Sequence, residues 1–302
     1  MTTKPYENLL YRELSNAIAR PVINVASPLL KELVDYSTNA YIRCSSTDDY
    51  IGEENEDLAV FILYLHIIEM TDAIEVLVSQ SCSIPAFLLL RSNFEALLSM
   101  EYILENDYTT RSLSYLAEYI RQRLESYNRD DPNTSQGKEF QKHIANDIWG
   151  TDLPLPSIDE VKEWQSNYGT LLNDPQFQDI QNEYRRIKRN RKRRPNWYNL
   201  FGGPSNLRQL AIDLDRGGQY EVLYRSWSRI THGIDISRFL GKDSEGEHAI
   251  KALRDPNRIK TTTILSSAFI VTATSKMLEK FRPGETWGDW YGREVRPLMN
   301  RL

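Results

Sequence analysis

Arg225 and His232 lie seven residues apart in a segment whose side chains could act on a phosphodiester. The segment, 219–232, has the period of an amphipathic helix with one apolar and one polar face. Seven residues are nearly two turns, so both side chains point the same way, about 10 Å apart along the axis. Arginine could hold phosphate oxygens while histidine moves a proton; the alternative is an ordinary solvated face. The polar face also contains Glu221, Ser228 and Arg229, opposite Tyr220, Leu223, Tyr224, Trp227, Ile230 and Thr231.

Arg91 and Glu95 form a second pair of charges on a helix expected at 84–106, which is apolar nearly all the way round. Isolated buried charges are costly, so the two must compensate one another or face a polar pocket. One interpretation is a buried structural ion pair. The other is a pocket in which Glu95 orients Arg91 toward Arg225 and His232. A small-molecule enzyme that uses this pocket is a further alternative.

A basic run precedes an aromatic segment in the middle of the chain. Without its eight cations the chain has 29 basic and 42 acidic residues, a net charge of −13. One concentrated patch on an acidic body indicates a local contact with a polyanion. Arginines followed by rings such as Trp197 suit nucleic acid, whereas the alternatives are a solvated helix end or an import-like signal. The run comprises Arg185, Arg186, Lys188, Arg189, Arg191, Lys192, Arg193 and Arg194.

The sequence shows few features of a metal or cofactor site. The four histidines show no paired ligand spacing, and His66 lies on an apolar stripe that is typical of a core residue. No glycine-rich phosphate loop or nucleophile elbow is present. We therefore expect no metal and no cofactor. Cys44 and Cys82 are too few for a disulfide framework, which favours a reducing cytoplasm.

The 302 residues are 40% hydrophobic and 26% charged, which is typical of a globular protein. The start of the chain lacks the apolar stretch of a secretory signal. The most apolar stretches, 59–68 and 261–275, are shorter than the roughly 20 residues of a membrane-spanning helix. We therefore expect a cytoplasmic protein with no membrane partner.

Helical periodicity with proline and glycine stops predicts an all-α fold. A first helix should end at Pro21, and a second should begin at Ser27-Pro28. Long helices are expected at 57–80, 84–106, 109–129 and 259–281. The composition becomes more polar after residue 129, so we expect a multi-helix bundle interrupted by a smaller helical insertion. The expected parts are 1–129, 130–203 with the basic run, and 204–302 with Arg225 and His232.

The spacing Arg225-x6-His232 on a late helix resembles the Arg-x(4–6)-His motif of the HEPN superfamily. The residue after the arginine is Ser226, where that superfamily commonly has Asn, Asp or His. The chain is also similar, over about 55–240, to a bacterial helical family of unknown function. That similarity is carried by Arg91-Ser-Asn-Phe-Glu95, a tryptophan-containing segment, and Tyr220-x3-Tyr224-Arg225-x2-Ser228-x3-His232-Gly233.

The HEPN resemblance implies a metal-independent endoribonuclease, often a toxin or antiviral effector, whose active site is assembled in a homodimer. Arg225 would bind the scissile phosphate, and His232 would act in proton transfer. Ser228, Arg91 and Glu95 would complete the site, and Arg229 would join the basic run in binding RNA. The alternative function is a non-catalytic helical module that binds nucleic acid or a nucleotide, or that scaffolds partners in a defence or regulatory system.

Overall fold

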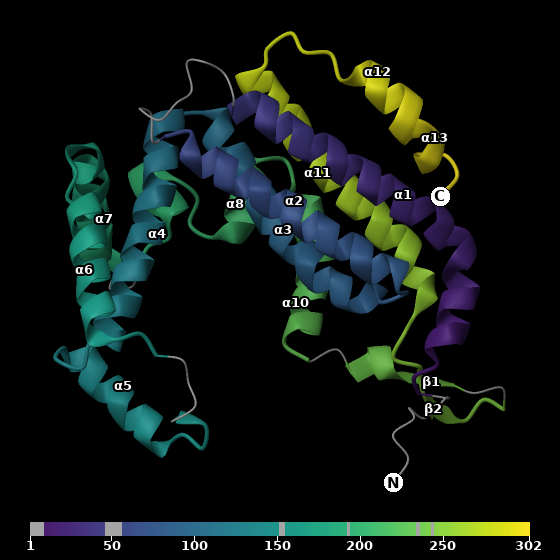
Figure 1. The fold of residues 1–302 in the computed structure, drawn as a ribbon, viewed down its shortest axis with the longest axis horizontal. Helices are drawn as coiled ribbons and strands as arrows, with labels where there is room; N and C mark the ends of the chain where they lie inside the picture. The colour runs from purple at the N-terminus through teal and green to yellow at the C-terminus, as the bar shows by residue number, and fades with distance from the viewer. Residues whose placement is uncertain (1–8, 46–55, 151–154, 192–193, 234–235, 243–244) are drawn as a thin grey trace. The chain divides into compact units, whose positions relative to one another are not determined.

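The computed structural model describes residues 9–45, 56–150, 155–191, 194–233, 236–242 and 245–302. These residues are almost entirely helical (Figure 1), so the predicted all-α class is confirmed. Two compact units can be distinguished. The bundle unit combines Met1–Asn106 with Arg208–Leu302, and the insertion unit is Asp107–Leu207.

Four long helices form the core of the bundle unit: α1 (Arg12–Ser45), α2 (Leu58–Ser79), α3 (Ser83–Glu105) and α11 (Ile259–Phe281). Helix α2 packs on α1 and α3, and α11 contacts all three. Leu30, Ile67 and Leu97 have no exposed surface, and complete burial of each such side chain stabilises the fold by about 1.5–3 kcal/mol. This core is the platform on which the later helices of the unit pack.

Helix α1 runs through both prolines, so the predicted break between Pro21 and Ser27 is wrong. Both rings are on the exposed side of the helix, seven residues apart. The carbonyls that lose a donor are those of Ala17 and Asn24, which are also exposed and which water can satisfy. Ser27 does not cap a helix; its Oγ donates to Glu75 Oε1 at 2.5 Å.

The candidate segment follows a short helix, α8 (Leu207–Asp213). It consists of α9 (Gly217–Gln219), the π-turn η4 (Tyr220–Tyr224) and α10 (Arg225–Thr231), which follow one another directly. Segment 220–231 packs on α3 through Tyr224 and Trp227, which are 8% and 3% exposed. Of the other residues of the expected apolar face, Tyr220, Leu223 and Ile230 are half-buried, whereas Thr231 is exposed, so the expected apolar face is too wide by that residue.

Shorter elements complete the bundle unit. A 3-10 turn η5 (Ile236–Phe239) leads into an antiparallel hairpin, β1 (Leu240–Lys242) with β2 (His248–Ile250), in which Leu240 pairs with Ile250. The turn η6 (Pro256–Arg258) precedes α11. The chain then continues through α12 (Gly288–Trp290), the π-turn η7 (Tyr291–Val295) and α13 (Arg296–Met299), which run along α1 (Figure 1).

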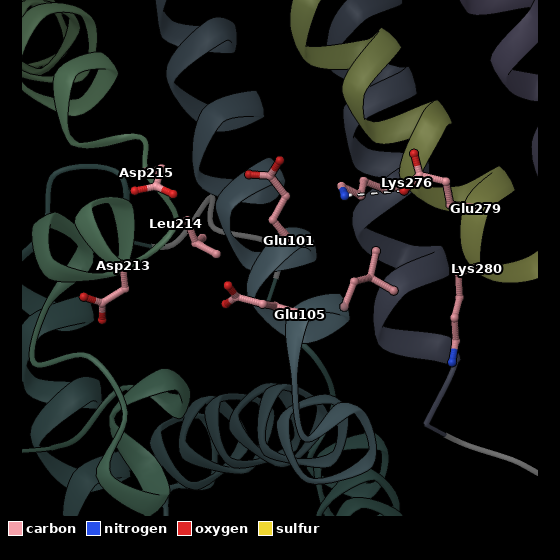
Figure 2. Close-up of a pocket in the computed structure, with 9 residues that line it drawn as sticks. Glu101, Glu105, Asp213, Leu214, Asp215, Lys276, Glu279 and Lys280 are labelled. Atoms are coloured by element: carbon pink, nitrogen blue, oxygen red, sulfur yellow. Dashed lines mark hydrogen bonds and ion pairs between the residues drawn. The ribbon is translucent and has the colours of Figure 1, made fainter.

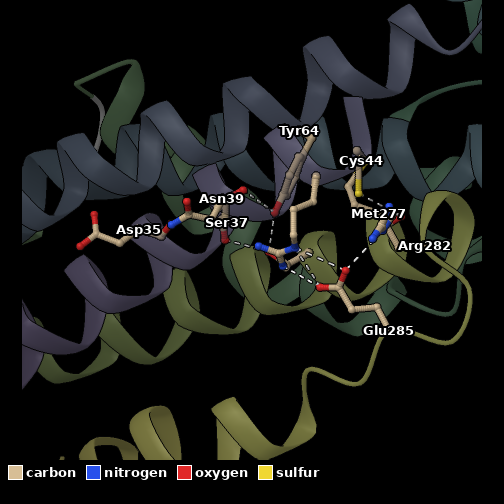
Figure 3. A network of polar contacts seen from close by, with 10 residues as sticks. Asp35, Ser37, Asn39, Cys44, Tyr64, Met277, Arg282 and Glu285 are labelled. Carbon is tan, nitrogen blue, oxygen red and sulfur yellow. Dashed lines mark hydrogen bonds and ion pairs between the residues drawn. The ribbon is translucent and has the colours of Figure 1, made fainter. Parts of the chain in front are cut away.

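Polar contacts join α1 to α11 and to Glu285, which lies between α11 and α12 (Figure 3). Arg43 Nη2 donates to Glu285 Oε1 at 2.6 Å, and Trp290 Nε1 donates to Glu32 at 2.6 Å. Deeper in the bundle, the Tyr64 hydroxyl lies 2.9 Å from Thr274 Oγ1 and donates to the Ser37 carbonyl. Burial raises the pKa of the Tyr64 phenol, so it remains a neutral donor.

The insertion unit contains α4 (Tyr108–Asp130), α5 (Ser135–Asn146), α6 (Ile158–Leu172), η2 (Pro175–Phe177), α7 (Gln178–Arg191) and η3 (Trp197–Gly202). Helix α6 begins at a capping box, in which Ser157 and Glu160 satisfy one another's backbone amides. Helix α4 contacts α5, α6 and α7.

The units divide the chain at residues 106–107 and 207–208, whereas the sequence pattern placed 108–129 in the bundle. Aromatic and cation–ring contacts explain the grouping. Tyr127 of α4 packs on Trp164 of α6 with ring centroids 5.2 Å apart, and Arg121 lies 4.0 Å from the ring of Tyr184 on α7.

No helix among the described residues is both long enough and apolar enough to cross a membrane.

Candidate functional site

The polar face of α10 is exposed to solvent. Arg225, Arg229 and His232 are exposed and Ser228 is half-buried, while Trp227 faces the core. His232 ends the helix, and its backbone amide donates to the Ser228 carbonyl at 3.2 Å. The helical spacing places Arg225 and His232 about 10 Å apart along the axis. A phosphodiester could therefore contact both.

Glu221 holds Arg225 in place at the start of this face. Arg225 Nη1 donates to Glu221 Oε2 at 2.8 Å, and Arg208 Nε donates to Glu221 Oε1 at 2.6 Å. Both hydrogen bonds lower the pKa of the Glu221 carboxyl, first that from Arg225 and then that from Arg208. The two guanidinium groups share one carboxylate, so this cluster keeps a net positive charge and can attract a phosphate.

Arg91 and Glu95 meet the same segment from α3, but at its buried face. Arg91 Nε donates to Glu95 Oε1 at 3.2 Å, and Arg91 Nη2 donates to the Tyr224 hydroxyl at 2.8 Å. That hydroxyl donates in turn to Glu95 Oε1 at 2.8 Å. Burial, followed by the hydrogen bond to Glu95, raises the pKa of Tyr224 to about 12, so the phenol stays protonated at neutral pH.

This geometry differs from both interpretations of the Arg91–Glu95 pair. The two side chains are 23% and 43% exposed, so neither charge is fully buried. Their polar partner is Tyr224, and among the described residues neither forms a hydrogen bond or ion pair with Arg225 or His232. The pair therefore fixes how this segment packs on α3. Because both side chains are partly exposed, replacing one of them leaves the other accessible to water rather than as an isolated buried charge.

The first part of the basic run lies on α7. Arg185, Arg186, Lys188 and Arg189 are exposed, while Tyr184 and Ile187 face the interior of the insertion unit. Arg186 is paired with Glu183 at 2.6 Å. Among the described residues, Arg185 donates to the side chains of Gln181 and Asn182, which are neutral. The side chain of Arg191, together with Lys192 and Arg193, lies outside the described residues.

Two predicted nucleic-acid contacts have internal roles in this structure. Arg194 donates to Glu118 at 2.9 Å and also to Glu125, which ties the end of the run to α4. Trp197 is only 8% exposed and packs edge-on against Tyr115, with ring centroids 5.3 Å apart. Its ring faces are therefore covered, because the turn η3 directs this side chain inward.

A separate cavity of about 350 Å³ lies in the bundle unit. Figure 2 shows carboxylates of α3 between the end of α8 and α11. Arg216 forms a two-pronged ion pair with Glu101 at 2.5 and 2.6 Å, so one of these charges is already neutralised. The cavity is lined by Glu101, Leu104, Glu105, Asp213, Leu214, Asp215, Lys276, Glu279 and Lys280.

Sequence reasoning missed Arg208 and the polar role of Tyr224. Arg208 is distant in sequence from Arg225, and Tyr224 counted only as an apolar residue. His66 is half-buried and bonded to Ser92 at 2.8 Å. Within the described ranges, no three His, Cys, Asp or Glu side chains are grouped as metal ligands.

Comparison with known proteins gives one match. The chain has no match among the curated proteins or among the solved structures. The model of a family of unknown function, DUF5677, matches residues 57–248, from α2 to β2. The match includes Arg91, Glu95, Tyr224, Arg225 and His232, and it spans nearly the same region as the helical resemblance noted in the sequence. Because it covers more than half of the 302 residues, the chain belongs to this family, DUF5677.

Proposed function

We propose that the protein is an HEPN-like endoribonuclease that cleaves RNA at the exposed face of α10 without a metal ion. The observation that carries the proposal is the shared face of Arg225, Ser228, Arg229 and His232, which is opposite the buried Tyr224 and Trp227. An arginine and a histidine on one accessible face provide a phosphate ligand and a proton carrier. These two functions suffice for attack by a ribose hydroxyl.

The proposed reaction uses the 2′-hydroxyl of the RNA as nucleophile. His232 accepts the hydroxyl proton while the 2′-oxygen forms a bond to phosphorus. The bond from phosphorus to the 5′-oxygen breaks, and that oxygen takes a proton from water, which reaches the exposed face. The hydroxide that remains takes the proton held by His232, which returns the imidazole to its neutral form. The products are a 2′,3′-cyclic phosphate and a 5′-hydroxyl. Arg225 stabilises the charge that accumulates on the phosphate oxygens.

One contact favours the alternative of RNA binding without cleavage. Ser226 Oγ donates to the Val222 carbonyl of its own helix at 2.8 Å. Ser226 follows the arginine, where the HEPN superfamily commonly has Asn, Asp or His. Here the hydroxyl hydrogen is directed to the backbone and away from a substrate.

The test is cleavage of end-labelled single-stranded RNA by the purified full chain, with and without EDTA. We expect cleavage in EDTA and cyclic phosphate ends. A placed histidine contributes about 10²–10⁴-fold to the rate, so His232→Ala should nearly abolish cleavage and leave RNA affinity intact. Arg225→Ala should reduce both, because the guanidinium binds phosphate in the ground state and in the transition state.

Two matched variants control for the loss of any exposed charge. His143 is an exposed helical histidine of the insertion unit, and Arg293 is 71% exposed and ion-paired with Glu294, as Arg225 is 67% exposed and paired with Glu221. His143→Ala and Arg293→Ala should retain cleavage. A requirement for a divalent metal, or full activity of His232→Ala, would overturn the mechanism. Binding without cleavage would support the non-catalytic alternative.

A further inference from the structure

Arg208 is a cation beside the candidate site that the proposed reaction does not use. Its Nε donates to Glu221 Oε1 at 2.6 Å, and Arg225 Nη1 donates to Glu221 Oε2 at 2.8 Å. The two oxygens of one carboxylate therefore hold two guanidinium groups next to one another. Arg208 is 58% exposed and Arg225 is 67% exposed, so a ligand in solution can reach both.

Both guanidinium groups keep donors for such a ligand. An arginine has several N–H donors in a planar fork, and each of these two uses a single nitrogen in its bond to Glu221. Among the described residues, neither group forms another hydrogen bond. Exposed ion pairs stabilise a protein by only about 0–1 kcal/mol, so the two side chains can adjust to an anion at little cost.

Both arginines lie on helices that are anchored in the bundle unit. Helix α8 is fixed by Leu210 and Ala211, which have no exposed surface. The connection from α8 to α9 is fixed by Arg216, which forms the two-pronged ion pair with Glu101 of α3. Helix α10 is fixed by Trp227, which is 3% exposed. The position of one arginine relative to the other is therefore set by the packing of these helices.

The charge of this cluster matches that of a phosphodiester. The hydrogen bonds from Arg225 and then from Arg208 lower the pKa of the Glu221 carboxyl, so it is ionised at neutral pH. Two guanidinium groups and one carboxylate thus carry a net charge of +1, and an internal phosphate of RNA carries a single negative charge. Guanidinium groups suit phosphate because their planar fork matches its oxygens.

We propose that Arg208 is a substrate-binding residue that acts together with Arg225 as a clamp on one phosphate of RNA, the scissile one. This inference rests on the proposed function, because it assigns a second ligand to the phosphate that Arg225 binds. Glu221 is the positioning residue that holds the two guanidinium groups together. Negative charge accumulates on both non-bridging oxygens as the 2′-oxygen attacks, so two arginines stabilise the transition state better than one.

The first test is fluorescence anisotropy with labelled oligouridine, in the His232→Ala background, so that the RNA stays intact. Arg208→Ala should weaken binding by about 10-fold, the lower end of the range for a hydrogen bond to a charged group. Arg208→Lys keeps the charge but not the planar fork, so it should recover only part of the affinity. Arg293→Ala is the matched control, because it removes a 71% exposed arginine that is also paired with a carboxylate.

The salt dependence of binding distinguishes one shared phosphate from two separate ones. Each neutralised phosphate of a single strand contributes about −0.7 to the slope of log affinity against log salt. Arg208→Ala alone should leave the slope nearly unchanged, because Arg225 still neutralises the shared phosphate. Replacing both arginines by alanine should flatten the slope by about 0.7. A change of about 1.4 in the double variant would mean two separate phosphates and would overturn the clamp.

Cleavage is measured separately, with protein that retains His232. Arg208→Ala should lower the rate at saturating RNA as well as the affinity, whereas Arg293→Ala should change neither. Equal affinity of Arg208→Ala and its parent for oligouridine would overturn the inference and leave the ribonuclease proposal standing. Binding that depends on Arg208, without cleavage by the unchanged protein, would count against the ribonuclease and in favour of the clamp.

Discussion

The Tyr224 hydroxyl links α3 to the segment that bears the candidate site. It accepts a hydrogen bond from Arg91 and donates one to Glu95, both at 2.8 Å. Arg91 also lies 4.7 Å from the centre of the Tyr224 ring, where the charge is attracted to the ring face. Since Arg225 is the next residue, this contact fixes the direction in which the polar face of α10 points.

Tyr224→Phe keeps the ring and removes only this hydroxyl. We expect the free energy of unfolding to fall by about 1–2 kcal/mol, since bonds to charged partners are broken but those partners can be hydrated. Urea denaturation measures the change. Tyr220→Phe is the matched control, because Tyr220 stacks on Tyr224 with centroids 4.9 Å apart and its hydroxyl has no partner among the described residues. Equal destabilisation in both variants would contradict the assigned role.

At the scale of elements, helix boundaries were predicted correctly where the local sequence contains a capping box or a stop signal. Helix α11 has the expected limits, Ile259–Phe281, and α6 begins after its capping box at Ser157. Helix α1 could not be predicted in this way. Whether Pro21 interrupts a helix depends on whether the proline lies on the side of the helix that faces water. It also depends on how much apolar surface of α1 is covered by α2 and α11, and neither is a local property.

Pro21→Ala should stabilise the protein by about 1–2 kcal/mol. Alanine restores an amide donor for the exposed Ala17 carbonyl and removes the ring that crowds it, although the unfolded chain gains some entropy. Thermal unfolding of the two chains measures the difference. Asn24→Ala, another exposed position of α1, controls for helix propensity. A lower unfolding midpoint for Pro21→Ala would mean that the proline ring stabilises the protein more, by restricting the unfolded chain, than it destabilises the helix.

At the scale of the whole molecule, each unit has its own core, and an ion cluster organises that of the insertion unit. Glu118 and Arg121 are each 8% exposed, and Arg194 donates to the same Glu118 carboxylate. Burial lowers the pKa of Arg121. Among the described residues, Glu118 is the one carboxylate that pairs with the buried Arg121, whereas Arg194 is also paired with Glu125.

Glu118→Gln should destabilise the insertion unit by about 3 kcal/mol, because Arg121 is left as a buried charge without compensation. Hydrogen exchange should become faster in α4 and α7, while α1, α2 and α11 keep their protection. Glu125→Gln removes a 49% exposed partner of Arg194 and should have little effect. Equal acceleration in both units would show that they do not unfold separately.

The candidate site was predictable only in part. The period of 3.6 residues placed Arg225 and His232 on the solvent side, since the aromatic residues of the opposite face, Tyr224 and Trp227, had to be buried. The inward position of Trp197 could not be predicted, because the turn η3 has no repeating pattern that shows which side chains face the interior. A contact such as Arg208–Glu221 depends on the tertiary fold, so the local sequence does not predict it.

The bundle unit is discontinuous in sequence, and this affects how the protein folds as it is synthesised. Ser37 of α1 bonds to Thr274 of α11 across 237 positions. At about 5–20 residues per second, α1, α2 and α3 leave the ribosome about 10–50 s before the helix that completes their core. The insertion unit is finished earlier and can fold first. The nascent chain thus carries uncovered apolar helices through most of translation, and it should depend on a chaperone until α11 emerges.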